Sequence, residues 1–500
     1  MKREEGKRQL LLALWCLLTA AVMIGLCSRS SPIFPMNDWD DTNCFFTVGK
    51  AMFNGRVTYR DIYEQKGVLL YFLYGLAWLI SHRSFLGGYV LETLCFAAFL
   101  RTAAETARKL GVLRGFCLLI PCLGAVLCSS YSFFLGGCAE EIALPFLYPA
   151  LHVFLTTGED RGWLPRPQQI VLLGAMAGCV LWIKYTLLGL YVGYVLFIAI
   201  LLSARRDFAA LGNAAGLFLL GVLLATLPWL LYFGANGAVG DWFGVYFYDN
   251  MSCYSGVDPE LGLLRFLRDS IGHAILWNGR TSLLIALGAL VFLLGRRPLP
   301  VKAGLLLLYL CATLLPFIGG TAFDYYGYAY AAMAVPGILA VSRLLERGIE
   351  ALSRRAALPR IAALLLCLCL LAGGGVFARR HSVNSFFSAY RPEDLWFSRF
   401  AADIAESEDQ SLLSYGALDH GLYTVTGYVP QTRFFCHLNL NKPELEEEQD
   451  RYIREQETEF VLLAKELKPL VLEYYEVVDS AESFDEFESF PMSYYLLRRK

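Results

Sequence analysis

The sequence predicts a polytopic α-helical membrane protein of about 11 to 13 spans, with a small extracytoplasmic α/β domain at its C-terminus. Of the 500 residues, 56% are apolar and only 18% are charged, and the mean hydropathy is +0.46. A soluble chain carries roughly 25% charged residues. Apolar runs of membrane length recur as far as residue 378, whereas the chain from Arg379 onward is charged and mixed. We therefore expect a membrane domain over 1–378, with its first outer loop at 29–66, and a soluble domain over 379–500.

The net charge and the cysteines exclude several classes of protein. The formal net charge is −2 and the pI is near 6.3, and basic residues are confined to loops that flank apolar runs, so no nucleic-acid-binding surface is expected. The 14 cysteines lie mostly inside apolar runs, where a thiol behaves as a small hydrophobe. The sequence contains no CxxC pair and no Cys/His cluster with zinc spacing. We therefore expect neither a disulfide framework nor a structural zinc site.

The first element is predicted to be a signal anchor. Two basic pairs, beginning with Lys2-Arg3, precede an apolar run from Leu10 to Cys27. No small-x-small cleavage site follows, and the run is long enough to cross about 30 Å of hydrocarbon. Basic residues favour the cytoplasmic side, so the loop after Cys27 is predicted to lie outside.

Further apolar segments follow this anchor along the chain. They lie at 67–82, 85–104, 115–134, 142–157, 168–184, 187–203, 211–233, 270–294, 301–318, 327–345 and 359–378. The basic loops between them are predicted to be cytoplasmic, at Arg108-Lys109-Arg114, Arg161-Arg166, Arg205-Arg206, Arg296-Arg297-Lys302 and from Arg343 to Arg360. Twelve full crossings would return the C-terminus to the cytoplasm. The short run 67–82 is the segment that we expect not to cross.

The C-terminal residues 379–500 are predicted to form a small α/β domain outside the cytoplasm, because strand-like and helical patches alternate there. The strand-like patches lie at 412–415, 460–463 and 493–497, and a helical one lies at 443–457. Asp419-His420 follow the first strand without a nucleophilic serine or cysteine and do not indicate a second active site. We expect deletion of 385–500 to leave donor binding intact and to reduce transfer to the acceptor.

The first outer loop carries an unusual group of acids. Asp38, Asp40 and Asp41 fall within four positions, and the pattern from Thr42 to Asn54 is typical of an interfacial amphipathic helix. Asp41 is predicted to be the N-cap of this helix, with Thr42 as the alternative, but one cap does not account for three acids. A second group, Asp61, Glu64 and Lys66, stands directly before the next apolar run.

The order of motifs in this loop resembles a known superfamily. After the anchor, Asp-Asp-Thr-Asn opens a helix that ends in Gly-Lys-Ala-Met, and Tyr-Arg-Asp and then Glu-Gln-Lys-Gly follow before Leu-Leu-Tyr. This order resembles the GT-C superfamily, and more closely the bacterial polyprenyl-phosphate-sugar-dependent glycosyltransferases of the aminoarabinose-transferase and protein-mannosyltransferase type. The resemblance implies a GT-C fold, a catalytic aspartate at Asp41 and a phosphate-facing lysine at Lys66. The family usually has proline where this sequence has Gly67-Val68.

The chemistry of such a transfer needs these residue types. A sugar on a polyprenyl phosphate is already activated, so the reaction needs a base for the acceptor hydroxyl and a cation for the departing phosphate. Asp41, or Asp40 in its place, is the predicted base, Lys66 is the predicted cation, and a single displacement predicts inversion. No cofactor is required, and a divalent metal is kept as an alternative. The predicted partners are a polyprenyl-phosphate-linked sugar, membrane lipid and an extracytoplasmic glycan, lipid or protein acceptor.

Other polar residues at membrane level have two interpretations each. Glu140 and Glu141 either bind sugar, acceptor or a metal shared with Asp40, or occupy a helix N-terminus whose dipole favours acids. Lys184 either snorkels or meets the donor phosphate. The tyrosines of the AFDYYGYAY loop either stack against a sugar or belong to an interfacial aromatic belt. They include Tyr325 and Tyr326.

Three functions stay open at this point. The first is a glycosyltransferase of the cytoplasmic membrane whose active site faces outside. The second is a polyprenyl-linked glycan transporter or flippase, which would need charges deep within its spans and for which the halves of the chain give no sign of inverted symmetry. The third is a catalytically inactive scaffold with an outer sensing domain.

Overall fold

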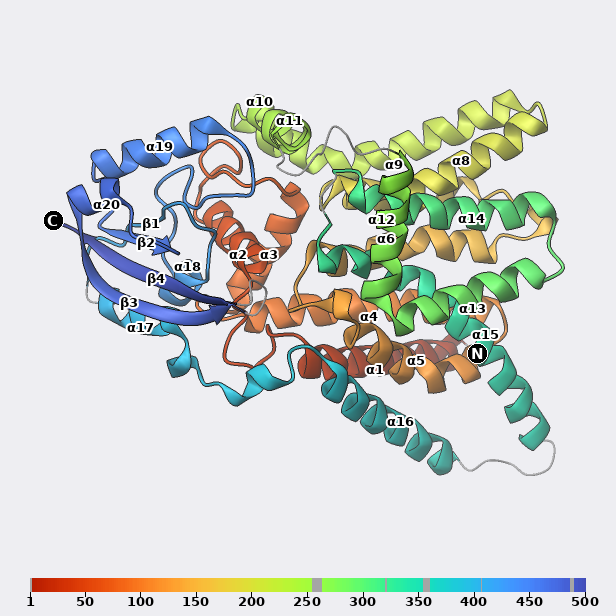
Figure 1. Cartoon of the computed structure of the whole chain (residues 1–500). Coiled ribbons are helices and arrows are strands. Elements are labelled where there is room, and N and C mark those ends of the chain that lie inside the picture. Colours follow the sequence, from red (N-terminus) through yellow and green to blue (C-terminus); the bar gives the residue numbers. More distant parts are fainter. Residues whose placement is uncertain (1, 254–262, 320–321, 354–359, 406, 486–489) are drawn as a thin grey trace. The chain divides into compact units, whose positions relative to one another are not determined.

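The structure is a computed structural model that describes residues 2–253, 263–319, 322–353, 360–405, 407–485 and 490–500. Most of these residues are helical (Figure 1). The chain divides into two compact units. Unit 1 consists of Met1–Ser28, Leu91–Pro228 and Asp258–Phe386, and unit 2 consists of Arg29–Val90, Trp229–Val257 and Phe387–Lys500. The first outer loop and the C-terminal segment therefore belong to the same unit. A single domain boundary between residues 378 and 379 would separate them.

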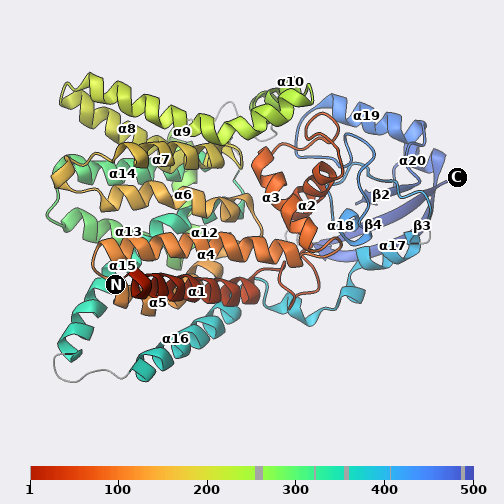
Figure 2. The same ribbon diagram turned by 180° about the vertical axis from the view of Figure 1, so that it is seen from behind.

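Unit 1 is built of long helices, several of which run side by side, such as α8 with α14 and α5 with α16 (Figures 1 and 2). Its helices are α1 (Lys2–Cys27), α4 (Leu86–Lys109), α5 (Leu113–Cys128), α6 (Ala139–Thr156), α7 (Pro167–Leu181), α8 (Gly189–Ala204), α9 (Phe208–Ala235), α12 (Leu263–Asn278), α13 (Arg280–Leu294), α14 (Leu299–Leu314), α15 (Ala331–Ser353) and α16 (Arg360–His381). Two of them, α4 and α9, continue into unit 2 at one end. Each predicted apolar segment of this unit is thus largely helical.

Several helices have the length and composition of membrane spans. Among the residues that the structure describes, six stretches qualify, namely Arg3–Cys27, Tyr185–Ala204, Phe208–Ala235, Leu299–Phe317, Asp324–Ala351 and Ile361–His381. Shorter apolar helices cover Val68–Ile80, Leu113–Cys128 and Pro167–Leu181. The chain is therefore a multi-pass membrane protein, and the number of 11 to 13 spans stays a prediction.

One predicted span is interrupted. The segment 270–294 contains the end of α12 and all of α13, and these two helices meet at an angle of 108°. Gly279 lies at the bend with φ +38°, a value that glycine adopts without a steric cost. A straight crossing over 270–294 is therefore wrong. The basic residues Arg354 and Arg355, and residues 254–262 of the predicted outer loop, lie outside the described residues.

Helix α3 (Val68–Ile80) is too short to cross a membrane upright. Its 13 residues extend about 20 Å at 1.5 Å per residue, against roughly 30 Å of hydrocarbon. It packs against α2 (Asp40–Phe53), and the backbones approach so closely that a Cβ at Gly49 would lie 2.5 Å from the Gly75 nitrogen. This geometry supports the expectation that 67–82 does not cross.

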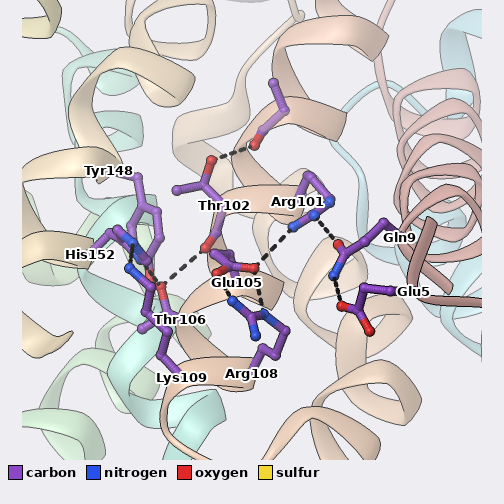
Figure 3. Close-up of polar contacts among 11 residues, drawn as sticks. Glu5, Gln9, Arg101, Thr102, Glu105, Thr106, Arg108, Lys109, Tyr148 and His152 are labelled. Atoms are coloured by element: carbon purple, nitrogen blue, oxygen red, sulfur yellow. Dashed lines mark hydrogen bonds and ion pairs between the residues drawn. The ribbon is translucent and has the colours of Figure 1, made fainter. Parts of the chain in front are cut away.

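A polar network joins α1, α4 and α6 inside unit 1 (Figure 3). The carboxylate of Glu105 accepts hydrogen bonds from Arg108 at 2.6 and 2.9 Å and lies 3.7 Å from Arg101. The Thr106 hydroxyl lies 2.8 Å from the Tyr148 hydroxyl and 2.7 Å from Nδ1 of His152. Arg101 and Arg108, in the C-terminal half of α4, therefore both contact the Glu105 carboxylate.

Unit 2 contains a four-stranded sheet in the order β1-β2-β4-β3. Its strands are β1 (Leu412–Ser414), β2 (Phe460–Ala464), β3 (Tyr475–Asp485) and β4 (Phe490–Arg499), and its helices include α17 (Trp396–Ile404), α18 (Leu422–Thr426), α19 (Pro443–Arg454) and α20 (Pro469–Tyr474). β1 pairs with β2 in parallel, and the other pairs are antiparallel. The three predicted strands and the predicted helix at 443–457 are confirmed, and β3 was not predicted.

Candidate active site

Helix α2 begins two residues earlier than predicted. Its first turn contains Asp40 and Asp41, and its N-cap is Trp39, which makes no side-chain cap. The Asn37 side chain accepts a hydrogen bond from the Trp39 nitrogen at 3.1 Å, and the Asn43 side chain donates to the Trp39 carbonyl at 3.0 Å. The prediction of Asp41 or Thr42 as the cap is wrong. Both aspartates instead lie at the positive end of the helix dipole with carboxylates that the cap does not use.

Asp38 has a structural role. Arg29 Nη1 lies 2.6 and 2.9 Å from its two carboxylate oxygens. Only 3% of Arg29 is exposed, and its guanidinium lies 3.9 Å from the centroid of the Phe387 ring. Because this carboxylate is committed to a buried cation, Asp38 is a poor candidate for a base.

Asp40 contacts a histidine from the C-terminal segment. Nδ1 of His420 lies 2.6 Å from Oδ1 of Asp40, and the His420 ring meets the Tyr494 ring edge-on at 5.2 Å. Burial raises the pKa of Asp40, the His420 charge opposes that rise, and the charges of Asp41 and Asp38 add to it. The structure therefore places Asp40 in a carboxylate–imidazole pair that the sequence did not predict.

The polar side of α2 is buried as well as the apolar side. The Thr47 hydroxyl donates to Asp419 at 2.7 Å, and the Lys50 ammonium donates to the Tyr423 carbonyl at 2.7 Å. The Thr424 hydroxyl donates to the Asn43 side chain, also at 2.7 Å. Residues 419–424 therefore cover the polar face of α2, and its interpretation as an interfacial helix stays a prediction.

Burial changes the titration of this network. Lys50 is 0% exposed, and burial lowers its pKa to about 7, with the Asp419 charge opposing the shift and Arg83 adding to it. Burial also raises the pKa of Asp419, and hydrogen bonds from the Thr47 hydroxyl and the Gly421 nitrogen oppose this rise.

Asp41, Glu64 and Lys66 form one electrostatic group. The backbone nitrogen of Lys66 donates a hydrogen bond to the Glu64 carboxylate at 2.8 Å, and the Tyr71 hydroxyl donates to the same carboxylate. Burial raises the pKa of Glu64, Lys66 opposes that rise, and Asp41 adds to it. The Lys66 ammonium lies 5.8 Å from the Phe45 ring centroid on α2. Asp41 and Lys66, the two residues predicted from the motif, thus both act electrostatically on the buried Glu64.

The loop that carries Lys66 forms hydrogen bonds with the segment around Asp249. Asp249 Oδ2 accepts from the Tyr63 hydroxyl at 2.7 Å and from the Lys442 ammonium at 2.8 Å. The Asn250 side chain donates to the Gln65 carbonyl at 2.7 Å. These bonds fix the backbone on the N-terminal side of Lys66.

A second polar group lies in unit 1. The Lys184 ammonium lies 2.6 Å from Glu140 Oε1, 3.6 Å from the Tyr326 ring centroid and 5.6 Å from that of Tyr325. Only 7% of Lys184 is exposed. Snorkelling of Lys184 is therefore wrong, because a buried carboxylate neutralises it.

The neighbouring Glu141 is also fully buried. One of its oxygens accepts from the Gly137 nitrogen at 2.9 Å. Its other oxygen and Oε2 of Glu140 have no hydrogen-bond partner among the described residues. No group of three or more His, Cys, Asp or Glu side chains within the described ranges has the arrangement of a metal site.

Sequence reasoning missed four residues of these groups. Glu64 stands two positions before Lys66, and that spacing could have identified it. Lys50, Asp419 and His420 gave no such signal, because their roles depend on contacts between α2 and a segment more than 350 residues later in the chain.

The fold that positions these groups is the GT-C type that the sequence predicted. The solved structures that share it include two of ArnT from Cupriavidus metallidurans. The structure bound to undecaprenyl phosphate matches with a TM-score of 0.62 and 13% sequence identity, over 97% of this chain and 97% of that chain. The apo structure matches with a TM-score of 0.59 and 15% identity, over 96% and 97%. No protein-family model and no curated protein sequence matches the chain.

Proposed function

We propose that this protein is an integral membrane glycosyltransferase that moves a sugar from a polyprenyl-phosphate donor to an extracytoplasmic acceptor. The observation that carries the proposal is the shared fold, over almost the whole of both chains, with ArnT in a structure bound to undecaprenyl phosphate. The grouping of Asp41, Glu64 and Lys66 supports it, because a base and a cation are what such a transfer needs.

The proposed reaction is a single displacement. The acceptor hydroxyl gives its proton to Asp41 as its oxygen forms a bond to the anomeric carbon. The bond from that carbon to the phosphate oxygen breaks, and the phosphate leaves with its charge opposite Lys66. Inversion at the anomeric carbon follows.

Asp40 is the alternative base. The contact with His420 occupies one of its carboxylate oxygens, which favours Asp41 for the primary role. The proposed part of His420 is to fix the orientation of Asp40 beside Asp41.

The group in unit 1 is proposed to contact the donor or acceptor. The Lys184 ammonium is buried beside Glu140, and a buried cation at this position suits the phosphate of the donor. Tyr325 and Tyr326 present rings next to that ammonium, which suits a sugar face. Glu141 supplies a buried carboxylate oxygen for a hydroxyl donor.

The proposed location is the cytoplasmic membrane, with both groups on the outer side. The distribution of basic loops supports this orientation. If 67–82 does not cross, the anchor and the later segments place the C-terminus outside with the first loop.

Transfer from a defined donor tests the function. The purified protein, reconstituted in nanodiscs, is incubated with polyprenyl-phosphate-linked radiolabelled sugars and a membrane lipid extract as acceptor. We expect label to move to a new product, with and without a chelator. Movement of intact donor across a liposome membrane without transfer would identify a flippase, and neither event would identify a scaffold.

A further inference from the structure

A groove of about 260 Å³ lies in unit 1 where the C-terminal end of α13 meets α15 and the turn between α4 and α5. Its apolar wall includes Leu155, Val291, Phe292 and Leu339, and its rim carries Arg296, Arg297 and Arg343. Leu155 lies near the C-terminal end of α6, whereas Glu140 lies at the N-terminal end, about 22 Å away along the helix. The groove is therefore separate from the Lys184 group.

Close helix packing brings the arginines together. A Cβ at Gly288 of α13 would lie 2.5 Å from the Gly337 nitrogen of α15, so the two backbones touch. Arg297 follows α13, Arg343 lies on α15, and the Arg297 guanidinium lies 4.1 Å from the Phe292 ring centroid. Burial lowers the pKa of Arg297, and the Arg343 charge lowers it further. The two guanidinium groups are near enough to repel each other.

These arginines differ from the other basic residues of unit 1. Arg101 and Arg108 share Glu105 (Figure 3), and Arg114 lies 2.5 Å from Glu346. In the part of the chain that the structure describes, none of the three groove arginines forms an ion pair with a carboxylate. The contact that Arg343 makes is a long one, 3.4 Å to the Leu110 carbonyl. Uncompensated cations at an apolar groove are complementary to an anion with an apolar chain.

We propose that this groove binds one anionic phospholipid of the adjacent leaflet, which the basic loops predict to be cytoplasmic. The phosphate lies between Arg297 and Arg343, and an acyl chain lies along α13 over Val291. A free phosphate would leave the apolar wall bare, whereas a phospholipid covers it. Basic pockets between membrane helices on this side are where anionic head groups bind.

Lipid retention by the whole purified protein tests the site. The protein in detergent is exchanged with phosphatidylglycerol or phosphatidylcholine and examined by native mass spectrometry. We expect phosphatidylglycerol to be retained about tenfold or more over phosphatidylcholine, since two basic residues contribute to its affinity. The double variant Arg297→Ala/Arg343→Ala should lose this preference, and Val291→Phe should weaken it by filling the groove.

Two matched variants serve as controls. Arg161→Ala/Arg166→Ala removes two exposed arginines of another basic loop, and Leu290→Phe introduces the same side chain one residue away on α13. Val291 is 46% exposed and Leu290 is 54% exposed, so neither substitution crowds the core. Both controls should keep the preference for phosphatidylglycerol.

Three results would overturn the proposal. The first is equal retention of the two phospholipids by the parent protein. The second is retention by the groove variants equal to that of the parent. The third is loss of bound phosphatidylglycerol when millimolar inorganic phosphate is added, which would assign the groove to free phosphate.

Discussion

Replacing Lys50 with methionine should weaken the contact between α2 and residues 419–424, and the loss should grow as the pH rises. The variant removes the hydrogen bond to the Tyr423 carbonyl and a cation that opposes the rise of the Asp419 pKa, while methionine keeps the length and apolar stem of the side chain. Leaving the buried Tyr423 carbonyl without its donor costs about 1–3 kcal/mol.

The sign of the pH dependence follows from the Lys50 pKa. This pKa is about 7 in the folded protein and 10.5 as its ordinary value. Between these values the unfolded chain binds one more proton than the folded chain, so Lys50 makes the parent more stable as the pH rises. The variant lacks that gain. Its Asp419 also loses an opposing cation, so the Asp419 pKa rises further and destabilises the variant at higher pH.

The magnitude is bounded by linkage. One proton contributes about 1.36 kcal/mol per pH unit, so between pH 7 and pH 9 the cost of the substitution grows by at most about 2.7 kcal/mol, or 100-fold in an opening equilibrium. Two thiols report that opening directly. Cys44 on α2 and Cys436 are both buried, with sulfur atoms 3.9 Å apart.

The assay measures thiol labelling of these two cysteines, peptide by peptide, by mass spectrometry. The ratio of the variant rate to the parent rate should rise between pH 7 and pH 9, and taking the ratio removes the intrinsic pH dependence of the thiol. Lys468→Met, at an exposed lysine paired with Glu466, should give a ratio near one at both pH values. A Lys50→Met ratio that stays constant or falls would refute the reasoning.

The remaining predictions concern the transfer reaction and its side of the membrane. Asp41→Asn should reduce transfer at least about 100-fold while the protein stays folded, and near-normal turnover would move the base to Asp40. Lys66→Ala should weaken binding of the polyprenyl-phosphate donor in a direct binding assay, whereas Lys66→Arg should keep part of it, and normal binding by both would exclude contact with the phosphate. A cysteine introduced at Glu447, on the exposed side of α19, should react with a membrane-impermeant thiol reagent in intact cells, and labelling only after lysis would put the C-terminal segment in the cytoplasm.

The helices were predictable because their signal is local. Long apolar runs with basic flanks need no knowledge of neighbours, and the structure has helices at each of them. The bend between α12 and α13 was missed although Asn278-Gly279 is a turn signal, because the apolar residues on both sides outweighed it. Strand β3 was missed because its four acidic residues interrupt the apolar pattern that predicts a strand. It is an edge strand with one solvated face, where acidic residues are tolerated.

The candidate site was predictable only where one motif contains it. Asp41 and Lys66 lie in the same loop, and the order of motifs identified both. The partners of Asp40 and Lys184 were not predictable, because His420 and Glu140 are distant from them in the sequence and contact them only in the folded chain. A charge in a sequence indicates that a partner is needed, but it does not indicate which one.

The polar stripe of α2 shows how far such reasoning extends. Asn43, Thr47 and Lys50 follow a spacing of four and three residues, which places them on one helix face whether that face meets water or protein. The C-terminal segment supplies partners for all three side chains, so deletion of 385–500 would remove these partners and expose this face of α2. The earlier expectation that deletion spares donor binding is therefore replaced. We expect the truncated protein to lose donor binding, measured by retention of labelled polyprenyl phosphate, and unchanged binding would show that α2 holds its place without the C-terminal segment.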